Sequence, residues 1–290
     1  MKPAPFTYHA PTSLGDVSGL LAEHGDDAKV LAGGQSLVPM LALRLTRFDH
    51  IIDLNRVSEL QGVEQSNGAL TIKAMTRQAD VEHDAVAGQA VPLLAQALPL
   101  IGHFQIRNRG TIGGSIAHAD PASELPAVAL ALDADLEVVG PRGSRSIPAA
   151  DFFVGTWTTA IEPDEIVAAV RFPVWDGKCG FAVEEIARRS GDFALAGVVC
   201  AVVVDGSGAV TRSAISLFAM APTPIRARAA ETALNGSNPA ASDLAEIGRL
   251  AIDDCAPTAD VHASAEYRMH VGAHVVERAL DRALGDARRG

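Results

Sequence analysis

Cysteine is scarce in this 290-residue sequence. The three cysteines, Cys179, Cys200 and Cys255, are far apart, and none belongs to a C-x-x-C pair. Iron–sulfur clusters and thiolate zinc sites need grouped cysteines. The sequence therefore predicts neither on this chain, and it indicates no metal site of any other kind. So few cysteines also suit a reducing compartment, and we expect a cytoplasmic protein.

Other absences exclude further classes of protein. No apolar run approaches the length of a membrane-spanning helix, and the first residues lack the apolar centre of a signal peptide. The formal net charge is −11, and no basic stripe is visible. This charge argues against binding to nucleic acid or to an anionic membrane surface. Aromatic residues make up only 4% of the chain, so the core must consist mainly of Ala, Val, Leu and Ile.

The hydrophobic pattern predicts three parts and an α+β fold. Residues 1–55 show a strand–helix–strand order, with a helix over residues 13–24 capped by Ser13. Residues 56–175 mix antiparallel strands with helices, and Asn67-Gly68 between two apolar runs indicates a hairpin. Residues 176–290 contain three strand-like runs and then three helical stretches. We therefore expect a C-terminal α+β domain with a three-stranded antiparallel sheet.

Two glycine pairs stand out. The first, in "LAGGQSL" at residues 31–37, follows a short buried strand and precedes a helix. Consecutive glycines leave backbone N–H groups open to a phosphate, and Ser36 could add a hydroxyl. The alternative for this pair alone is a tight strand-to-helix turn without a ligand.

The second pair, in "RNRGTIGGSIAHADP", favours the ligand-binding interpretation. It is flanked by Thr111 and Ser115, with Arg107 and Arg109 just upstream. Two such segments could hold the two phosphates of a dinucleotide from two sides. Neither segment is a G-x-G-x-x-G fingerprint or a Walker loop, so a Rossmann site and a P-loop are excluded.

Together, "AGGQSLVPMLALRL" and "QIRNRGTIGGSIAHADPASELP" resemble the FAD-binding medium subunit of the molybdenum hydroxylases. This family includes aerobic carbon monoxide dehydrogenase, xanthine dehydrogenase and bacterial N-heterocycle dehydrogenases. The resemblance extends over essentially the whole chain, including "EEIARRSGDFALAGV". It implies the FAD-binding fold of the p-cresol methylhydroxylase and vanillyl-alcohol oxidase type, followed by the C-terminal domain of the flavoprotein subunit.

The resemblance also implies roles for individual residues. Glu124 matches an acidic FAD contact, Ile101 a side chain that packs on the flavin, and Phe193 a tyrosine near the isoalloxazine ring. The two FAD-binding segments correspond to Leu31, Ala32, Gly33, Gly34, Gln35, Ser36 and Leu37, and to Thr111, Ile112, Gly113, Gly114 and Ser115.

Three positions depart from the family pattern. Gln35 replaces a frequent histidine and Ser115 a common asparagine, and neither change threatens FAD binding. Glu184 stands where xanthine dehydrogenases have a lysine near the flavin. This difference weakens the expectation that NAD is the direct electron acceptor.

In this family the medium subunit does not bind the organic substrate. The resemblance implies a large molybdenum-cofactor subunit and a small subunit with two [2Fe–2S] clusters as partners, arranged as a dimer of heterotrimers. The acceptor would be a quinone, oxygen or NAD. Two alternatives stay open: a self-contained FAD-dependent oxidoreductase of related fold, and an assembly subunit that has lost FAD.

The remaining candidate residues have ordinary interpretations. His118 is expected to be a partly exposed loop histidine, and Trp157 is expected to have a packing role. Arg107 and Arg109 could either attract phosphate or form surface ion pairs. No Ser/His/Asp set and no carboxylate pair stands out, so no catalytic residue is predicted, as expected where the cofactor supplies the chemistry.

Overall fold

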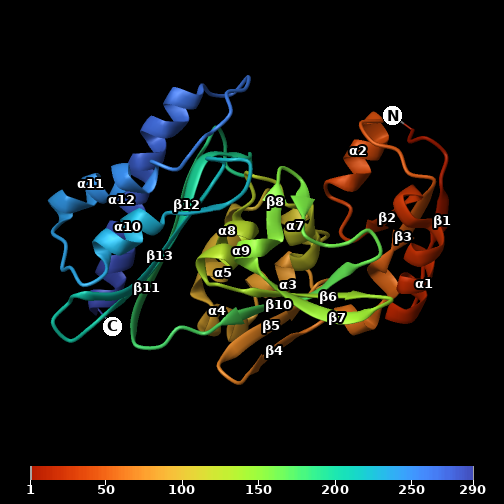
Figure 1. The fold of residues 1–290 in the computed structure, drawn as a ribbon, viewed down its shortest axis with the longest axis horizontal. Helices are drawn as coiled ribbons and strands as arrows, with labels where there is room; N and C mark the ends of the chain where they lie inside the picture. The colour runs from red at the N-terminus through yellow and green to blue at the C-terminus, as the bar shows by residue number, and fades with distance from the viewer. Residues whose placement is uncertain (1, 290) are drawn as a thin grey trace.

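The computed structural model describes residues 2–289, which form three parts along the longest axis of the molecule (Figure 1). The N-terminal part lies at one end, a part built on a five-stranded sheet lies in the middle, and the C-terminal part lies at the other end. The three parts follow one another in chain order, and the fold is α+β, as predicted. Among residues 2–289, no helix combines the length and the apolar character that crossing a membrane requires.

Three short parallel strands form the N-terminal sheet, in the order β1-β3-β2. They are β1 (Thr7–His9), β2 (Ala28–Leu31) and β3 (His50–Asp53), joined by helices α1 (Leu14–His24) and α2 (Leu37–Leu43). Helix α1 begins as the sequence predicts, because the Ser13 hydroxyl accepts the N–H of Asp16 at 3.1 Å. This helix buries Val17 and Leu21 against the sheet, in a small core that also receives residues of the middle sheet.

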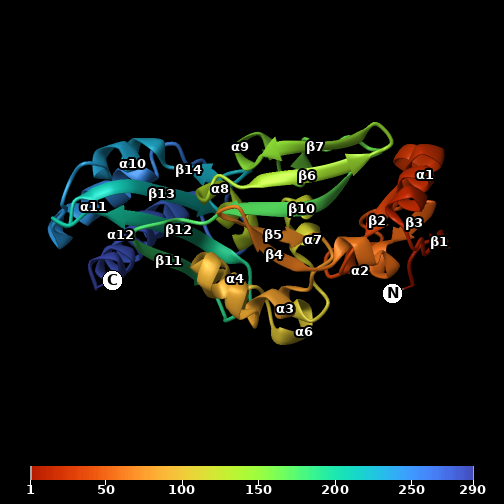
Figure 2. The same cartoon turned by 90° about the horizontal axis from the view of Figure 1, so that it is seen from below.

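The middle sheet is antiparallel, with strand order β4-β5-β10-β6-β7 (Figure 2). Its strands are β4 (Val63–Ser66), β5 (Ala69–Lys73), β6 (Asp135–Gly140), β7 (Gly143–Pro148) and β10 (Ile166–Pro173). The predicted hairpin between β4 and β5 is confirmed. Asn67 and Gly68 have φ values of 50° and 71°, the left-handed conformation of a type I′ turn.

The connections of the middle part are mostly short helices. They are α3 (Gln78–Glu82), α4 (Ala85–Ala90), α5 (Pro92–Ala97), α6 (Phe104–Arg107), α7 (Ile112–His118), α8 (Glu124–Ala131) and α9 (Ala149–Phe152), with a small hairpin of β8 (Phe153–Gly155) and β9 (Thr158–Thr159). Single 3₁₀ turns η1 (Gly25–Asp27), η2 (Leu54–Arg56), η3 (Ser58–Leu60) and η4 (Leu98–Leu100) complete this half of the chain.

The C-terminal sheet has four strands rather than the predicted three, in the order β11-β12-β13-β14. The three long strands are β11 (Lys178–Ala187), β12 (Ala194–Val204) and β13 (Val210–Phe218). The extra strand β14 (Ile225–Arg226) takes the start of the segment expected to be helical, because its two residues pair with β13. Helices α10 (Arg228–Leu234), α11 (Ala241–Ala251) and α12 (Ala265–Arg289) cover one face of this sheet.

Helix α8 connects the middle and C-terminal sheets. All of its residues from Glu124 to Ala131 are buried, so it has no face in contact with solvent. Its core combines side chains of the middle sheet, such as Leu136 and Val170, with Val199 and Phe218 of the C-terminal sheet. The two sheets therefore share one hydrophobic core.

A buried ion pair ties α8 to the C-terminal part. Arg226 donates to the carboxylate of Glu231 at 2.5 Å and to the Leu130 carbonyl at 2.8 Å. The same carboxylate accepts the Ile215 N–H at 2.8 Å. Side-chain exposure is 8% for Arg226 and 6% for Glu231, so neither charge has water as an alternative partner.

We predict that Glu231→Ala destabilises the protein strongly. The substitution leaves the buried Arg226 guanidinium with only the half-exposed Asp133 carboxylate, 2.8 Å away, as a counter-charge. Breaking a buried ion pair by removing one partner typically costs about 3–5 kcal/mol. The free energy of unfolding in urea measures this change. Arg142→Ala is the control, because Arg142 forms an ion pair of similar length with Asp164 but is 64% exposed. Equal losses of stability for both variants would contradict the importance of the buried pair.

Candidate functional site

The first glycine segment forms a cradle of free backbone donors. Within residues 2–289, no hydrogen bond uses the backbone N–H of Gly33, Gly34, Gln35 or Ser36. Gly34 has a φ of 74°, a left-handed conformation that suits glycine and turns successive N–H groups toward one side. Residues 31–35 of the segment line a hollow of about 350 Å³, and Ser36 follows directly and is exposed, so these donors are available to a ligand.

Side chains from other elements complete this first hollow. Asp53 and Asn55 line it from the end of β3, and Arg109 lines it from the segment before α7. The Asn55 amide donates to the Ala32 carbonyl at 3.1 Å and holds the glycine segment in place. Free N–H groups and an exposed guanidinium together suit an anionic group.

Arg77 braces the two glycine segments, and no pattern in the sequence indicates this role. Its guanidinium donates to the Arg109 carbonyl and, at 2.5 Å, to the Asn55 side-chain oxygen. Burial and the nearby charge of Arg109 lower the pKa of Arg77. Arg77 thus fixes the spacing between the two segments from behind the hollow.

The second glycine segment is not a second cradle. Residues 112–118 form helix α7, whose N-cap is Thr111. The N–H groups of its first turn already have protein acceptors within 2.8 to 3.1 Å. The four bonds run from Ile112 to the Thr76 carbonyl, from Gly113 to the Ala74 carbonyl, and from Gly114 and Ser115 to the side-chain and backbone oxygens of Thr111. The expected pair of phosphate nests is therefore reduced to one.

Close packing of protein on protein explains the glycines that face each other. A Cβ at Gly33 would lie 2.3 Å from the Arg109 carbonyl oxygen. A Cβ at Gly114 would lie 3.1 Å from the Ala32 Cβ and 2.6 Å from the Thr111 hydroxyl, and one at Gly113 would meet Ala74. These positions need glycine because the segments touch, whereas the sequence had suggested contact with a phosphate as the reason.

The other predicted residues of the two segments have distinct places. Leu31 and Ala32 line the hollow, and the Gln35 side chain folds back to the Gly33 carbonyl at 3.1 Å. Ser36 is exposed at the N-cap of α2, and Leu37 is the first residue of that helix. The Ser115 hydroxyl lies 3.1 Å from the Ser123 hydroxyl, just before α8.

A second hollow of about 750 Å³ lies between the middle and C-terminal parts. Asp120 to Ala122 line it directly beyond the end of α7, so this helix, about 10 Å long, links the two hollows. Phe193 lines it and is 73% exposed. Trp157 also lines it and is 61% exposed, so its ring packs at the surface, beside His118, and not in the core. Its indole N–H donates to Asp120 at 3.2 Å.

Ile101 lies next to this second hollow. Gly191 lines the hollow and packs closely on the residue after Ile101. A Cβ added to Gly191 would lie only 3.0 Å from the carbonyl oxygen of Gly102. Ile101 itself is partly buried against the main core. The turn that carries Ile101 and the turn that carries Phe193 are therefore in contact.

Glu124 is a buried acid at the first position of α8. Burial raises the pKa of its carboxyl to about 8, and the nearby Glu185 and Asp120 contribute. Burial also raises the pKa of Glu185 to about 7. Glu124 is thus mainly protonated at neutral pH and can donate a hydrogen bond, which an ionised carboxylate cannot.

Glu184 lies on the other face of β11, although the resemblance placed it near the flavin. Its carboxylate accepts hydrogen bonds from Arg278, at 3.0 Å, and Arg282 of helix α12. Successive side chains of a strand point to opposite faces, so Glu185 and not Glu184 neighbours Glu124.

Two charged residues have structural roles. Arg107 forms an ion pair with Glu82 at 2.6 Å and also donates to the carbonyls of Ile101 and Gly102, so it is not free to attract phosphate. His118 is the last residue of α7 and not a loop residue; its ring lies parallel to that of Trp157, 6.4 Å away. Burial lowers the pKa of His118 despite the Asp120 carboxylate 3.8 Å away.

Two known protein families match successive stretches of the chain. The family described as the FAD binding domain in molybdopterin dehydrogenase matches residues 4–175, and the family described as the CO dehydrogenase flavoprotein C-terminal domain matches residues 181–283. The first match contains all residues that line the first hollow, and residues of both matches line the second hollow.

Individual relatives are similar over their full length. The carbon monoxide dehydrogenase medium chain of Hydrogenophaga pseudoflava is 40% identical to this chain, over 98% of this chain and 98% of the relative. The 6-hydroxypseudooxynicotine dehydrogenase complex subunit alpha of Paenarthrobacter nicotinovorans is 41% identical, over 99% of this chain and 97% of the relative. A solved structure of the Hydrogenophaga pseudoflava carbon monoxide dehydrogenase, in a form lacking the Mo-pyranopterin moiety, superposes with a TM-score of 0.96 over 99% of both chains.

We predict that Glu124 makes the protein less stable as the pH rises. Its carboxyl has a pKa of about 8 in the fold against an ordinary value of 4.5, so the folded state holds one more proton between these values. Stability contributed by this group is therefore complete below pH 4.5 and falls, by up to about 1.4 kcal/mol per pH unit, as the pH rises to 8. Glu124→Gln should flatten this dependence.

Urea unfolding at several pH values between 5 and 8 measures the slope. Glu64→Gln is the control, because Glu64 is exposed on β4 and should leave the slope as it is. If Glu124→Gln and the unchanged protein have parallel pH profiles, the Glu124 carboxyl is ionised in the fold and this account of it fails.

Proposed function

The chain belongs to the family of FAD-binding medium subunits of molybdenum-containing dehydrogenases, and from this membership we propose that it is the electron-transfer subunit of a molybdenum hydroxylase complex. In this proposal it accepts electrons from the [2Fe–2S] clusters of a small partner subunit. It then passes them to an external acceptor.

The observation that carries the proposal is the cradle formed by Gly33, Gly34, Gln35 and Ser36. Four free N–H groups with Arg109 beside them offer what a pyrophosphate requires, so the residues present fit FAD. Asp53 in the same hollow can accept hydrogen bonds from ribose hydroxyls. We propose that α7 guides the cofactor toward the second hollow, with Thr111 and Ser115 as side-chain contacts rather than N–H donors.

The flavin end of the cofactor would lie at the second hollow. Ile101 and Phe193 supply apolar and aromatic surface, which excludes water from a ring packed against it. Glu124, protonated at neutral pH, can donate a hydrogen bond toward the ring without adding a negative charge. When bound, FAD supplies the capacity to exchange both single electrons and electron pairs, which links one-electron clusters to two-electron acceptors.

Phe193 would also mark the surface that faces the partner. It is 73% exposed beside the hollow, where a docked iron–sulfur subunit could cover it. Aromatic side chains are enriched in the buried centres of protein interfaces. We therefore propose that the cluster-bearing subunit approaches on this side.

The wider assembly is part of the same proposal. The partners would be a large molybdenum-cofactor subunit and the small iron–sulfur subunit, paired as a dimer of heterotrimers in the cytoplasm, with quinone, oxygen or NAD as acceptor. The three free thiols of this chain suit such a reducing location. The two relatives described above are named for different substrates at nearly equal identity, so we propose that the molybdenum subunit selects the substrate.

The division of the chain belongs to the proposal as well. Residues 1–55 would form the first FAD-binding subdomain, residues 56–175 the second, and residues 176–290 the C-terminal domain. Each range contains its own sheet among the described residues, and the cofactor would lie across all three.

We predict that Gly34→Ala weakens FAD binding. Alanine pays about 1–2 kcal/mol to adopt the left-handed conformation, so the loop leaves it and the N–H groups no longer converge. The FAD dissociation constant should rise about tenfold, equivalent to about 1.4 kcal/mol. Fluorescence titration of the flavin-free chain measures it.

Gly68→Ala is the matched control. Gly68 has a nearly equal φ of 71°, but a Cβ there meets nothing within 4 Å, and it lies in the hairpin between β4 and β5. In this variant alanine must adopt the same left-handed backbone conformation, with the same energetic cost, but at a position outside the cradle. Unchanged FAD affinity in Gly34→Ala, or an equal loss in both variants, would show that the cradle does not hold the cofactor.

We predict that the FAD-loaded chain alone turns over no hydroxylation substrate. Its flavin should be reduced rapidly only by the prereduced iron–sulfur subunit, and Phe193→Ala should slow that step severalfold while FAD content stays constant. Stopped-flow absorbance of the flavin follows the reaction. Phe6→Ala, which changes a 38% exposed phenylalanine on the N-terminal segment, is the control.

Two results would contradict the relay function. Substrate-dependent flavin reduction in the lone chain would support the self-contained oxidoreductase instead. Failure of the reduced iron–sulfur subunit to reduce the flavin would exclude it as the electron donor.

A further inference from the structure

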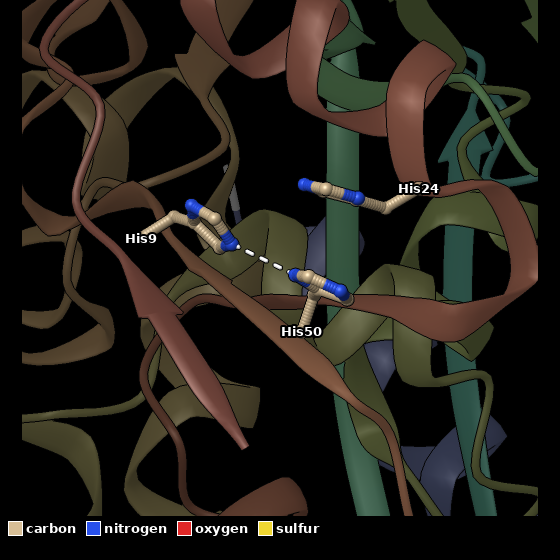
Figure 3. Close-up of side chains that lie close together, drawn as sticks. All are labelled: His9, His24 and His50. Atoms are coloured by element: carbon tan, nitrogen blue, oxygen red, sulfur yellow. Dashed lines mark hydrogen bonds between the residues drawn. The ribbon is translucent and has the colours of Figure 1, made fainter.

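Three histidines from three different elements converge at the edge of the N-terminal sheet (Figure 3). His9 ends strand β1, His24 ends helix α1 and His50 begins strand β3. One nitrogen of each imidazole lies within 4.8 Å of one nitrogen of the other two. Within residues 2–289, this is the one group of three or more potential metal-binding side chains of this kind.

The backbone holds these rings in place. Thr7 pairs with His50 and His9 pairs with Ile52 in the parallel register, so His9 and His50 project from the same face of the sheet. Ile52 on that face is fully buried in the core that α1 covers, and His24 is the last residue of α1. All three imidazoles are half-buried.

The spacing is close to that of metal ligands. His9 Nε2 lies 3.0 Å from His50 Nδ1, and the His24 ring stacks on the His50 ring with centroids 3.7 Å apart (Figure 3). Two nitrogens bound at about 2.05 Å to one tetrahedral Zn²⁺ are about 3.3 Å apart. Small rotations of the rings would therefore bring all three nitrogens to one ion.

We propose that His9, His24 and His50 form a binding site for a divalent transition-metal ion of the Zn²⁺ type. Three neutral imidazoles are a ligand set that such ions prefer, and they leave a fourth position for water. Glu23, whose carboxylate lies 4.0 Å from His24 Nε2, is the nearest candidate for that position. The metal would replace the proton shared between His9 and His50.

The place of the site in the fold indicates a structural role. His50 pairs with Ala28 at the start of β2, while Leu31 at the end of β2 leads into the glycine cradle. The ion would thus link β1, α1 and β3 near the start of β2, whereas the cofactor would bind beyond the end of β2. It would stabilise the part that carries the cradle without touching FAD.

Zinc titration of the full chain tests this inference. The protein carries no histidine tag and is first treated with a chelator; Zn²⁺ binding is then followed by calorimetry. We expect one equivalent of Zn²⁺ per chain, and a rise in melting temperature with excess Zn²⁺. Each of His9→Gln, His24→Gln and His50→Gln should weaken Zn²⁺ binding by at least about tenfold, since even loss of residues that only support a ligand costs 10- to 100-fold.

Controls separate this site from nonspecific binding. His83→Gln changes an exposed histidine outside the cluster and should leave the affinity unchanged. Co²⁺ absorption of the unaltered protein gives a second readout that does not depend on folding of the variants, and a tetrahedral nitrogen-ligated spectrum is expected. No stoichiometric Zn²⁺ binding, a Co²⁺ spectrum of the hydrated ion, or equal affinity in all four variants would overturn the proposal. FAD content is measured in parallel and should not change with Zn²⁺.

Discussion

The contact between Gly33 and the backbone of Arg109 and Gly110 determines how the N-terminal part sits on the middle part. A Cβ at Gly33 would lie 2.3 Å from the Arg109 carbonyl oxygen, so only glycine allows the two segments to meet. Arg77 and Asn55 hold this contact from behind through a chain of hydrogen bonds. The cradle is therefore a property of the junction between two parts rather than of one loop, and its free N–H groups keep their direction only while the junction is closed.

A second constraint comes from helix α8. Because it is buried on all sides between two sheets, the middle and C-terminal parts cannot move apart without exposing a large apolar surface. The second hollow lies along this same boundary, so its walls are held at a fixed separation. A fixed separation suits the electron transfer that we propose, which needs a constant geometry between donor and acceptor more than it needs a moving lid.

Much of this structure could be predicted from the sequence where local signals were strong. Ser13 and the Asn67-Gly68 turn are local features, and the elements they predict are present. The glycine pair at 113–114 suggested free N–H groups for a phosphate, whereas packing against Ala74 and capping by Thr111 make this segment the first turn of a helix.

Residues that act through tertiary contacts could not be found in this way. Arg77 lies far in sequence from both segments that it braces, and no spacing rule connects them. Glu184 and Glu185 differ in role because adjacent residues of a strand face opposite sides of the sheet. A sequence comparison that is uncertain by one residue cannot tell which of the two faces the cofactor side. The three histidines are likewise brought together only in the folded chain, His9 and His50 by the parallel pairing of β1 with β3 and His24 by the position of α1.

The small core of the N-terminal part has a consequence for how the protein opens. Its buried residues are fewer than those of either other core, and its strands are only three or four residues long. Local opening should therefore begin there, as an independent cooperative unit, while the two larger parts remain folded. A ligand that spans the junction at Gly33 and Arg109 binds only the closed form, so it raises the free energy of that opening by an amount that grows with the logarithm of its concentration relative to its dissociation constant. Cofactor loading then becomes the step that locks the least stable of the three parts, and the cofactor-free chain is the form most exposed to proteolysis.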